Sequence, residues 1–175
     1  MKRSVTLACC VMVACLPALA APQKAPTEKA MTDQQFVNMA AQTDMVEANL
    51  GQMAGNAATS QEVKDFATAR VTDNTADYQK LSNAAKQSDL TEPTAIDTAH
   101  NKTVIDPFEK LKGSTFDHRY AQEMITGETK SLAMYKKEAA SAQNQAIRTY
   151  AQAAIPELEK NLADARDLEK AKPAK

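Results

Sequence analysis

The sequence predicts an all-α fold, a four-helix bundle with a long crossover segment after the second helix. Glycine is scarce, with four residues in 175, and aromatic residues make up 5% of the chain. Alanine, glutamine, glutamate and lysine are abundant, and these residues favour helices over strands. Apolar residues recur at spacings of three and four along four long stretches, which indicates one buried face on each of four helices. A chain of this length suits a single core, so we expect one bundle domain over residues 32–170.

The first 20 residues have the layout of a secretory signal peptide. Lys2 and Arg3 provide a basic start, residues 4–16 are apolar, and residues 18–20 form an Ala-x-Ala cleavage site. The apolar run is shorter than the roughly 20 residues that span a bilayer. We therefore expect cleavage after Ala20 and export of the mature chain to the periplasm.

The three cysteines offer a second interpretation of this segment. Cys9, Cys10 and Cys15 all lie within it, so cleavage after Ala20 leaves a chain without disulfides or thiolate metal sites. However, residues 12–15, MVAC, resemble a bacterial lipobox. In that alternative, Cys15 becomes lipidated and anchors an otherwise soluble domain to a membrane.

Both ends of the mature chain are expected to lie outside the bundle. Residues 21–31 are small, charged and proline-containing, which predicts a disordered tether. Residues 171–175 form a short tail that we expect to fray. The formal net charge of −1 is weak, with both signs mixed along the chain. This charge gives no reason to expect a nucleic acid as a partner.

Capping signals place the starts of the four helices. Thr32 and Gln35 form a capping box for the first helix, and Ser60 is the expected N-cap of the second. Ser114 or Thr115 should cap the third. The four helices are expected at residues 33–58, 61–87, 114–141 and 145–170. Because the connections before the second and fourth helices are short, those neighbours should pack antiparallel.

The crossover segment comprises residues 88–113. Pro93 interrupts the helical pattern, and a weaker helix is expected over residues 95–105, ended by Pro107. A short helix should then begin at Pro107 and stop at Gly113. Four helices with one long connection correspond to the ferritin-like arrangement.

Each long helix carries one hydrogen-bonding residue near the middle of its apolar face. These residues are Glu47, Asn74, Glu128 and Asn161, and antiparallel packing would bring them to similar heights. Two carboxylates and two amides suit a hard divalent cation such as Ca²⁺ or Mg²⁺ better than iron, copper or zinc. The alternative is a polar layer that fixes the register of the helices. Arg70, one turn before Asn74, is placed to neutralise a carboxylate and favours this alternative, so no cofactor is expected.

Other candidate chemistry is weaker. His100 falls in the crossover and His118 in the first turn of the third helix, so neither is placed to join a mid-bundle site. Met39, Met45 and Met53 form no M-x-x-M or M-x-M pair, and we interpret them as core residues. The chain contains no Glu-x-x-His, H-E-x-x-H, G-x-S-x-G or glycine-rich phosphate loop. We therefore do not expect an enzyme.

Several stretches together resemble a bacterial family of secreted helical proteins. The family is described as predicted outer-membrane proteins, a domain of unknown function with a ferritin-like fold. The matching stretches are FVNMAAQTDMVEANLGQMA (36–54), EVKDFATARVTDNTADYQKL (62–81), LKGSTFDHRYAQEMITGETKSLAMY (111–135) and AAIPELEKNL (153–162). The resemblance covers nearly the whole mature chain and implies a ferritin-like bundle in the bacterial envelope. It implies no established activity.

The departures from this family fall within the predicted polar layer. The family pattern has histidine at the positions of Asn74 and Glu128, and often at Asn161, whereas Glu47 matches a family glutamate. An imidazole-based metal site in relatives therefore does not transfer to this chain. We expect a non-enzymatic envelope protein with an interaction, structural or stress-related role, whose partner is an unidentified envelope protein or cell-envelope component. The alternative is a degenerate ferritin-like protein that binds metal through the four layer residues.

Overall fold

The computed structural model describes residues 31–171, which contain helices and connections but no strand. Four long helices form the bundle: α1 (Asp33–Ala57), α2 (Gln61–Gln87), α4 (Gly113–Ser141) and α5 (Gln145–Lys170). The expected signal peptide, all but Met31 of the expected tether and all but Ala171 of the expected tail lie outside the described residues. No helix in the described range is long and apolar enough to cross a membrane. The all-α bundle prediction is confirmed.

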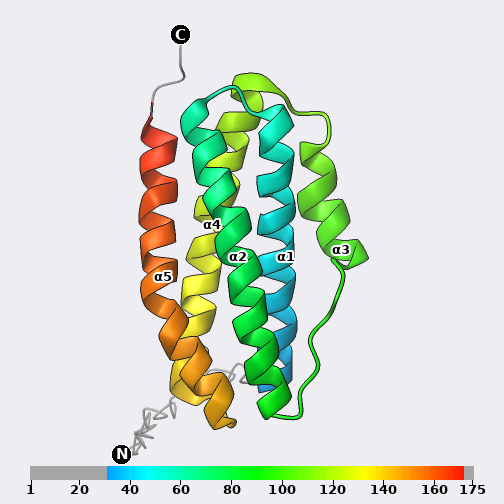
Figure 1. The fold of residues 1–175 in the computed structure, drawn as a ribbon, viewed down its shortest axis with the longest axis vertical. Coiled ribbons are helices and arrows are strands. Elements are labelled where there is room, and N and C mark those ends of the chain that lie inside the picture. The colour runs from blue at the N-terminus through cyan, green and yellow to red at the C-terminus, as the bar shows by residue number, and fades with distance from the viewer. Residues whose placement is uncertain (1–30, 172–175) are drawn as a thin grey trace, which may run out of the picture. The chain divides into compact units, whose positions relative to one another are not determined.

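The four long helices pack so that every neighbouring pair is antiparallel. α1 packs against α2 and α4, and α5 packs against the same two helices. In Figure 1, α1 and α5 run upward while α2 and α4 run downward. Since α2 and α4 run in the same direction, the chain must return along the bundle between them. The segment after α2 does so beside α1, which confirms the predicted crossover.

Local capping determines where the first two long helices begin. Thr32 and Gln35 form the predicted capping box, and the Ser60 hydroxyl accepts a hydrogen bond from the Val63 amide. The predicted cap of α4 was wrong. That helix begins one residue earlier than expected, at Gly113, after Lys112 as N-cap without a side-chain hydrogen bond. Gly113 has φ +63°, a conformation that glycine adopts easily. The chain therefore turns into α4 at this glycine and not at a side-chain cap.

The crossover is less helical than predicted. Its helical part comprises α3 (Thr98–His100), a π-helical turn (Asn101–Ile105) and a 3₁₀ turn (Asp106–Phe108). Residues 95–97, expected to be helical, instead lie in non-helical backbone, because the Asp97 side chain caps the His100 amide and starts the helix there. The expected short helix up to Gly113 ends at Phe108.

Two glutamines of α1 hold the non-helical part of the crossover. The Gln34 amide donates to the Thr91 carbonyl at 2.6 Å and accepts from the Thr91 amide at 3.2 Å. The Gln42 amide likewise donates to the Ala95 carbonyl and accepts from the Asp97 amide, both at 2.9 Å. These side chains satisfy main-chain groups that have no strand or helix to pair with.

Helices α1 and α2 approach closely at Gly51. A Cβ atom at this position would lie 2.7 Å from Val71 Cγ2 and 2.9 Å from the Ala67 carbonyl oxygen. Only glycine allows this contact, because the Ala67 carbonyl belongs to the helix backbone and cannot rotate away. The close approach lies one turn from Glu47 and fixes how deeply the α1 side chains enter the bundle.

The buried apolar residues form two clusters along the bundle. One includes Phe36, Leu81 and Tyr135, and the other includes Phe108, Phe116 and Tyr120. Of the three methionines expected in the core, Met45 and Met53 pack partly buried against these clusters. Met39 does not: it is 52% exposed, the only exposed large apolar residue in the described range. The core prediction for Met39 was therefore wrong, because its position faces the groove beside the crossover.

Candidate functional site

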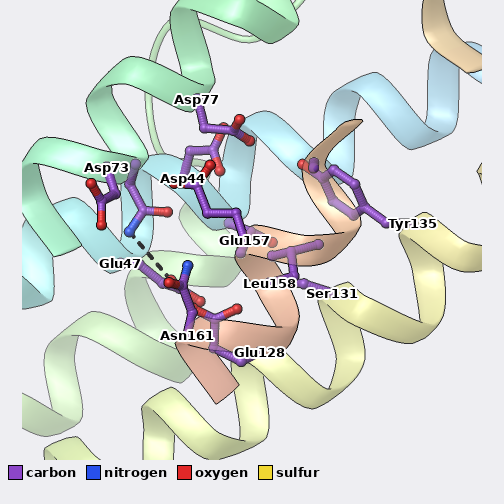
Figure 2. A pocket seen from close by; sticks show the side chains of 13 residues that line it. Asp44, Glu47, Asp73, Asp77, Glu128, Ser131, Tyr135, Glu157, Leu158 and Asn161 are labelled. Carbon is purple, nitrogen blue, oxygen red and sulfur yellow. Dashed lines mark hydrogen bonds between the residues drawn. The ribbon is translucent and has the colours of Figure 1, made fainter. Parts of the chain in front are cut away.

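The four residues of the predicted polar layer line one pocket in the middle of the bundle. Glu47 comes from α1, Asn74 from α2, Glu128 from α4 and Asn161 from α5. Figure 2 shows Glu47, Asn161 and Glu128 close together, with a dashed line to the Glu47 carboxylate. The structure therefore brings together all four residues that the helical periodicity singled out. Whether they bind metal stays a prediction.

The layer residues face one another in two pairs, each of them an amide beside a carboxyl group. Asn74 Nδ2 donates to Glu47 Oε2 at 3.3 Å and to the Arg70 carbonyl at 2.9 Å. Asn161 of α5 faces Glu128 of α4, and its side chain acts to lower the pKa of that carboxyl group. Glu47, Glu128 and Asn161 are buried, and Asn74 is half-buried. Each amide therefore steadies one carboxyl group and links two helices.

Arg70 is the cation of the layer and is itself 2% exposed. Its guanidinium hydrogen-bonds to Asp73, and its Nη1 lies 3.6 Å from Glu128 Oε1. The guanidinium also lies over the Phe66 ring, 5.4 Å from its centroid. The sequence-based expectation that Arg70 lies beside a layer carboxylate agrees with this geometry. Its positive charge opposes the binding of a further cation nearby.

Four more carboxyl groups line the same pocket, and the sequence analysis missed them. They are Asp44, Asp73, Asp77 and Glu157. Asp44 precedes Glu47 by three residues and Asp77 follows Asn74 by three, so the 3.6-residue period places them on the same helix faces. The sequence therefore contained this signal. The prediction considered only one polar residue on the apolar face of each helix and left out the residues one turn away.

Burial raises the pKa values of the deepest carboxyl groups. Burial and the nearby Glu47 raise the pKa of Glu128 to about 9, against the opposing effect of Arg70. Burial raises the pKa of Glu47 to about 7, although Asn74 and Arg70 act to lower it. Burial, followed by repulsion from Asp77 and Glu47, raises the pKa of Asp44 well above its usual range. At neutral pH the pocket therefore holds protons on carboxyl groups that are ionised in water.

The pocket leaves several buried oxygens without a hydrogen-bond partner among the described protein groups. These atoms are Asp44 Oδ2, Glu47 Oε1, Glu128 Oε2 and Asn161 Oδ1. The cavity between the lining residues has a volume of about 20 Å³, which accommodates a single water molecule or ion. No group of three or more His, Cys, Asp or Glu residues within the described range already has the spacing of a metal site. The oxygens would have to move closer together to bind a metal ion.

A glycine of α4 makes room for one of these oxygens. A Cβ atom on Gly127 would lie 2.8 Å from Glu47 Oε1. Glycine lowers helix stability by about 1 kcal/mol relative to alanine, yet it occupies the middle of a long helix here. Its hydrogen side chain lets the Glu47 carboxyl lie directly against the α4 backbone.

The pocket continues into a chain of hydroxyl groups. Tyr135 lines the pocket, and its hydroxyl hydrogen-bonds to the Tyr150 hydroxyl at 2.8 Å. Tyr150 in turn donates to Asp77 Oδ2 at 2.6 Å. Asp77 also faces Lys80 at 3.6 Å, on the more exposed side of α2. The carboxyl groups are thus connected through tyrosines to the aromatic cluster around Phe36.

Solved structures with a similar fold come from a protein described as CopM. The Cu(II)-bound form has a TM-score of 0.65 at 15% sequence identity, over 81% of this chain and 97% of CopM. The Ag-bound form has a TM-score of 0.61 at 16% identity, over 80% and 96% of the two chains. The Cu(I)-bound form gives 0.61 at 15% identity, with the same coverage. At this level of identity the likeness shows the fold.

A family model matches most of the sequence. It is described as "Domain of unknown function (DUF4142)" and matches residues 18–168. No curated protein gives a sequence match. The expected domain of unknown function is therefore confirmed, while the outer-membrane and ferritin-like parts of the expected resemblance stay predictions.

Proposed function

The chain belongs to the family of the domain of unknown function DUF4142, and from its pocket we propose that it is a non-enzymatic, cation-binding bundle of the bacterial envelope. The observation that carries this proposal is the set of partnerless oxygens around a 20 Å³ cavity. Small-molecule sites in proteins have volumes of about 300–1,000 Å³, so this cavity suits a single ion and not an organic substrate. The signal peptide predicted at residues 1–20 supports the envelope location.

The donor atoms favour a hard divalent cation. Glu47, Glu128 and Asp44 offer carboxylate oxygens, and Asn161 offers an amide oxygen. Such oxygens suit Ca²⁺, Mg²⁺ or Mn²⁺, whereas Cu(I) and Ag(I) prefer sulfur ligands. CopM, which has this fold, was solved with copper and with silver bound. That supports a metal-related role for the fold, with a different metal class suggested by the oxygens here.

Cation binding in this pocket must compete with protons. The raised pKa values of Glu47 and Glu128 mean that one or both carry a proton at neutral pH. A divalent cation would displace these protons, so its affinity should rise with pH. The direction of this dependence separates a site inside the pocket from adventitious binding to exposed carboxylates, which are already ionised at pH 7.

Metal analysis and melting of the purified mature protein test the proposal. We expect bound divalent metal after purification without chelator, a lower Tm in EDTA, and a rise in Tm when Ca²⁺ or Mn²⁺ is added back. The double variant Glu47→Gln/Glu128→Gln should lose this rise. Glu157→Gln is the matched control, because Glu157 lies at the rim of the same pocket and its side chain is 38% exposed. No bound metal together with no thermal shift would exclude the cation site.

A purely structural or interaction role is the second candidate, and Arg70 favours it. Its buried guanidinium already supplies a positive charge 3.6 Å from Glu128. In that case the layer serves only to hold the helices in register, and the protein acts by binding an envelope protein or other envelope component. Glu128→Leu separates the two candidates. If the layer is structural, the variant should be as stable as the wild type or more stable, because Glu128 is protonated at neutral pH and Asp73 still pairs with Arg70. If the pocket binds metal, the variant should lose the cation-dependent stabilisation.

A further inference from the structure

A second cavity lies between α1, the crossover and α4. Its volume is about 390 Å³, which is within the range of ligand sites in proteins. We call it the crossover groove. Its lining includes three methionines, a histidine, a glutamate and a lysine: Met39, Met124, Met134, His100, Glu123 and Lys130. This combination of thioethers and imidazole differs in kind from the oxygens of the acidic pocket.

Helix geometry places Met39 and Met134 at the same height in this groove. Glu47 of α1 touches Gly127 of α4, which fixes the register of these antiparallel helices. Met39 lies eight residues before Glu47, about 12 Å along α1, and Met134 lies seven residues after Gly127, about 10.5 Å along α4. Because the helices are antiparallel, both steps lead in the same direction. Met39 is 52% exposed and Met134 is half-buried, so both thioethers line the groove near its solvent side.

The crossover brings His100 to the same part of the groove. Gln42, three residues after Met39 on α1, holds the main chain at Ala95 and Asp97. His100 follows within one helical turn, and Figure 1 shows α3 beside α1. His100 Nδ1 lies 2.9 Å from Asp97 Oδ1. A carboxylate in this position accepts a hydrogen bond from Nδ1–H and so favours the tautomer in which Nε2 carries the lone pair, as is usual for histidine ligands of metals.

These groups have the chemistry of a soft-metal site. Thioethers select Cu(I), and imidazole is a good ligand for copper. Each methionine has three rotatable bonds, so two side chains at one height can converge on an ion without moving a helix. Glu47 and Glu123 also line the groove, against one lysine, Lys130. We propose that Met39, Met134 and His100 bind a soft monovalent cation, Cu(I) or Ag(I), in the crossover groove.

This site is independent of the cation proposed for the acidic pocket. Thr43, Glu47 and Ser131 line both cavities, but the thioethers and the imidazole belong to the groove alone. A hard cation in the pocket would depend on Glu47 and Glu128. A soft cation in the groove would depend on the methionines, so each proposal can fail without the other.

Titration with Ag⁺ tests the groove, because Ag⁺ is soft and needs no reductant. The full mature protein is titrated in a chloride-free buffer at neutral pH, with EDTA-treated protein to clear the acidic pocket. We expect one Ag⁺ per chain, with Met methyl NMR signals of Met39 and Met134 shifting. The double variant Met39→Leu/Met134→Leu and the variant His100→Gln should each raise the Kd by about tenfold or more. Leucine keeps the side-chain volume, and circular dichroism confirms the fold.

Met53→Leu is the matched control, since Met53 is also on α1 but packs against the Phe116 cluster outside the groove. Its Kd for Ag⁺ should equal that of the wild type. An unchanged Kd in the double methionine variant would overturn the proposal, and so would a wild-type chain that does not bind Ag⁺. A Kd that rises only in Glu47→Gln/Glu128→Gln would place the ion in the acidic pocket and overturn the groove site as well.

Discussion

Glu128 and Glu138 lie ten residues apart on α4, and both are almost fully buried, yet their surroundings differ. Glu128 faces an arginine, a second glutamate and an asparagine in the middle of the bundle. Glu138 lies at the end of the bundle beside Asp33, and burial followed by repulsion from Asp33 raises its pKa to about 7. Asp33 itself accepts hydrogen bonds from the Gln143 and Asn144 amides.

The comparison shows two ways of burying a carboxyl group. At the end of the bundle, main-chain and side-chain hydrogen bonds from Gln143 and Asn144 outweigh the effect of burial and lower the pKa of Asp33. Asp33 therefore stays ionised and Glu138 takes the proton between them. In the middle, Glu47 and Glu128 share one guanidinium, Asp44 lies beside these two carboxyl groups, and the pKa values of all three rise. The end has a fixed division of charge, whereas the middle holds protons that the proposed cation would displace.

Removing the arginine should have the largest effect on this comparison. Arg70→Met keeps an apolar stem but leaves the carboxyl groups of the layer without their buried cation. We expect a loss of about 3 kcal/mol in the free energy of unfolding, because Asp73 loses its charged hydrogen-bond partner and the layer loses the cation beside Glu128. Urea denaturation measures it. Lys136→Met is the control: Lys136 forms an exposed pair with Glu159 at 2.7 Å, and its loss should cost under about 1 kcal/mol.

Asp33→Ala tests the end of the bundle and should have the next largest effect. It removes acceptors for the Gln143 amide at 3.0 Å and for two Asn144 nitrogens at 2.6 and 2.9 Å. Leaving such donors unsatisfied should cost about 2 kcal/mol, measured by urea denaturation. Hydrogen exchange at residues 142–144 should accelerate more than exchange in the acidic pocket. Equal acceleration at both places would contradict the view that the end and the middle are separate.

The pH dependence of stability should distinguish the two glutamates. Each folded-state pKa is raised above the usual value of 4.5, so the associated stability is fully present below pH 4.5 and is lost as pH rises through the folded pKa. The loss ends near pH 7 for Glu138 and near pH 9 for Glu128. Glu138→Gln should therefore remove the dependence between pH 5 and 7, and Glu128→Gln the dependence up to pH 9. Thermal melts should show Glu128→Gln several degrees above the wild type at pH 8.

At pH 4 both glutamine variants should melt close to the wild type, since all three chains then carry a neutral group at these positions. A wild-type Tm that stays constant from pH 5 to 9 would contradict the buried, protonated state of both residues.

Gly127→Ala should have the smallest effect on stability and sharpens the geometry of the layer. Alanine adds about 1 kcal/mol of helix stability, but its Cβ would displace Glu47 Oε1. We expect the two effects nearly to cancel in the wild-type background. In a Glu47→Ala background the same change should stabilise the protein by about 1 kcal/mol. A double-mutant cycle measures the difference, and strict additivity would mean that Glu47 does not press against α4.

Local signals in the sequence predicted the helices well. The capping box at Thr32 and the cap at Ser60 depend on residues within three positions of each other, so the sequence displays them directly. The layer was also predictable, because the 3.6-residue period alone places Glu47, Asn74, Glu128 and Asn161 on buried faces. Asp44 and Asp77 follow the same period, so the sequence also allows their place in the pocket to be predicted.

Features that depend on distant partners were not predictable. The proton shared with Glu138 depends on Asp33, at the far end of the chain, and no periodicity connects the two residues. The start of α4 at Gly113 follows from a positive φ that only the folded turn requires. The exposure of Met39 was not predictable either, because it depends on how far the crossover lies from α1.

The two glutamines of α1, Gln34 and Gln42, have a consequence for how this protein can vary over evolution. Both form hydrogen bonds with main-chain carbonyl and amide groups of the crossover, and every amino acid except proline has both groups. These hydrogen bonds should therefore be kept after almost any substitution at the bonded positions within residues 91–97. Residues 91–97 can therefore change while the crossover stays attached to α1. Gln34 and Gln42 cannot be replaced without losing these hydrogen bonds.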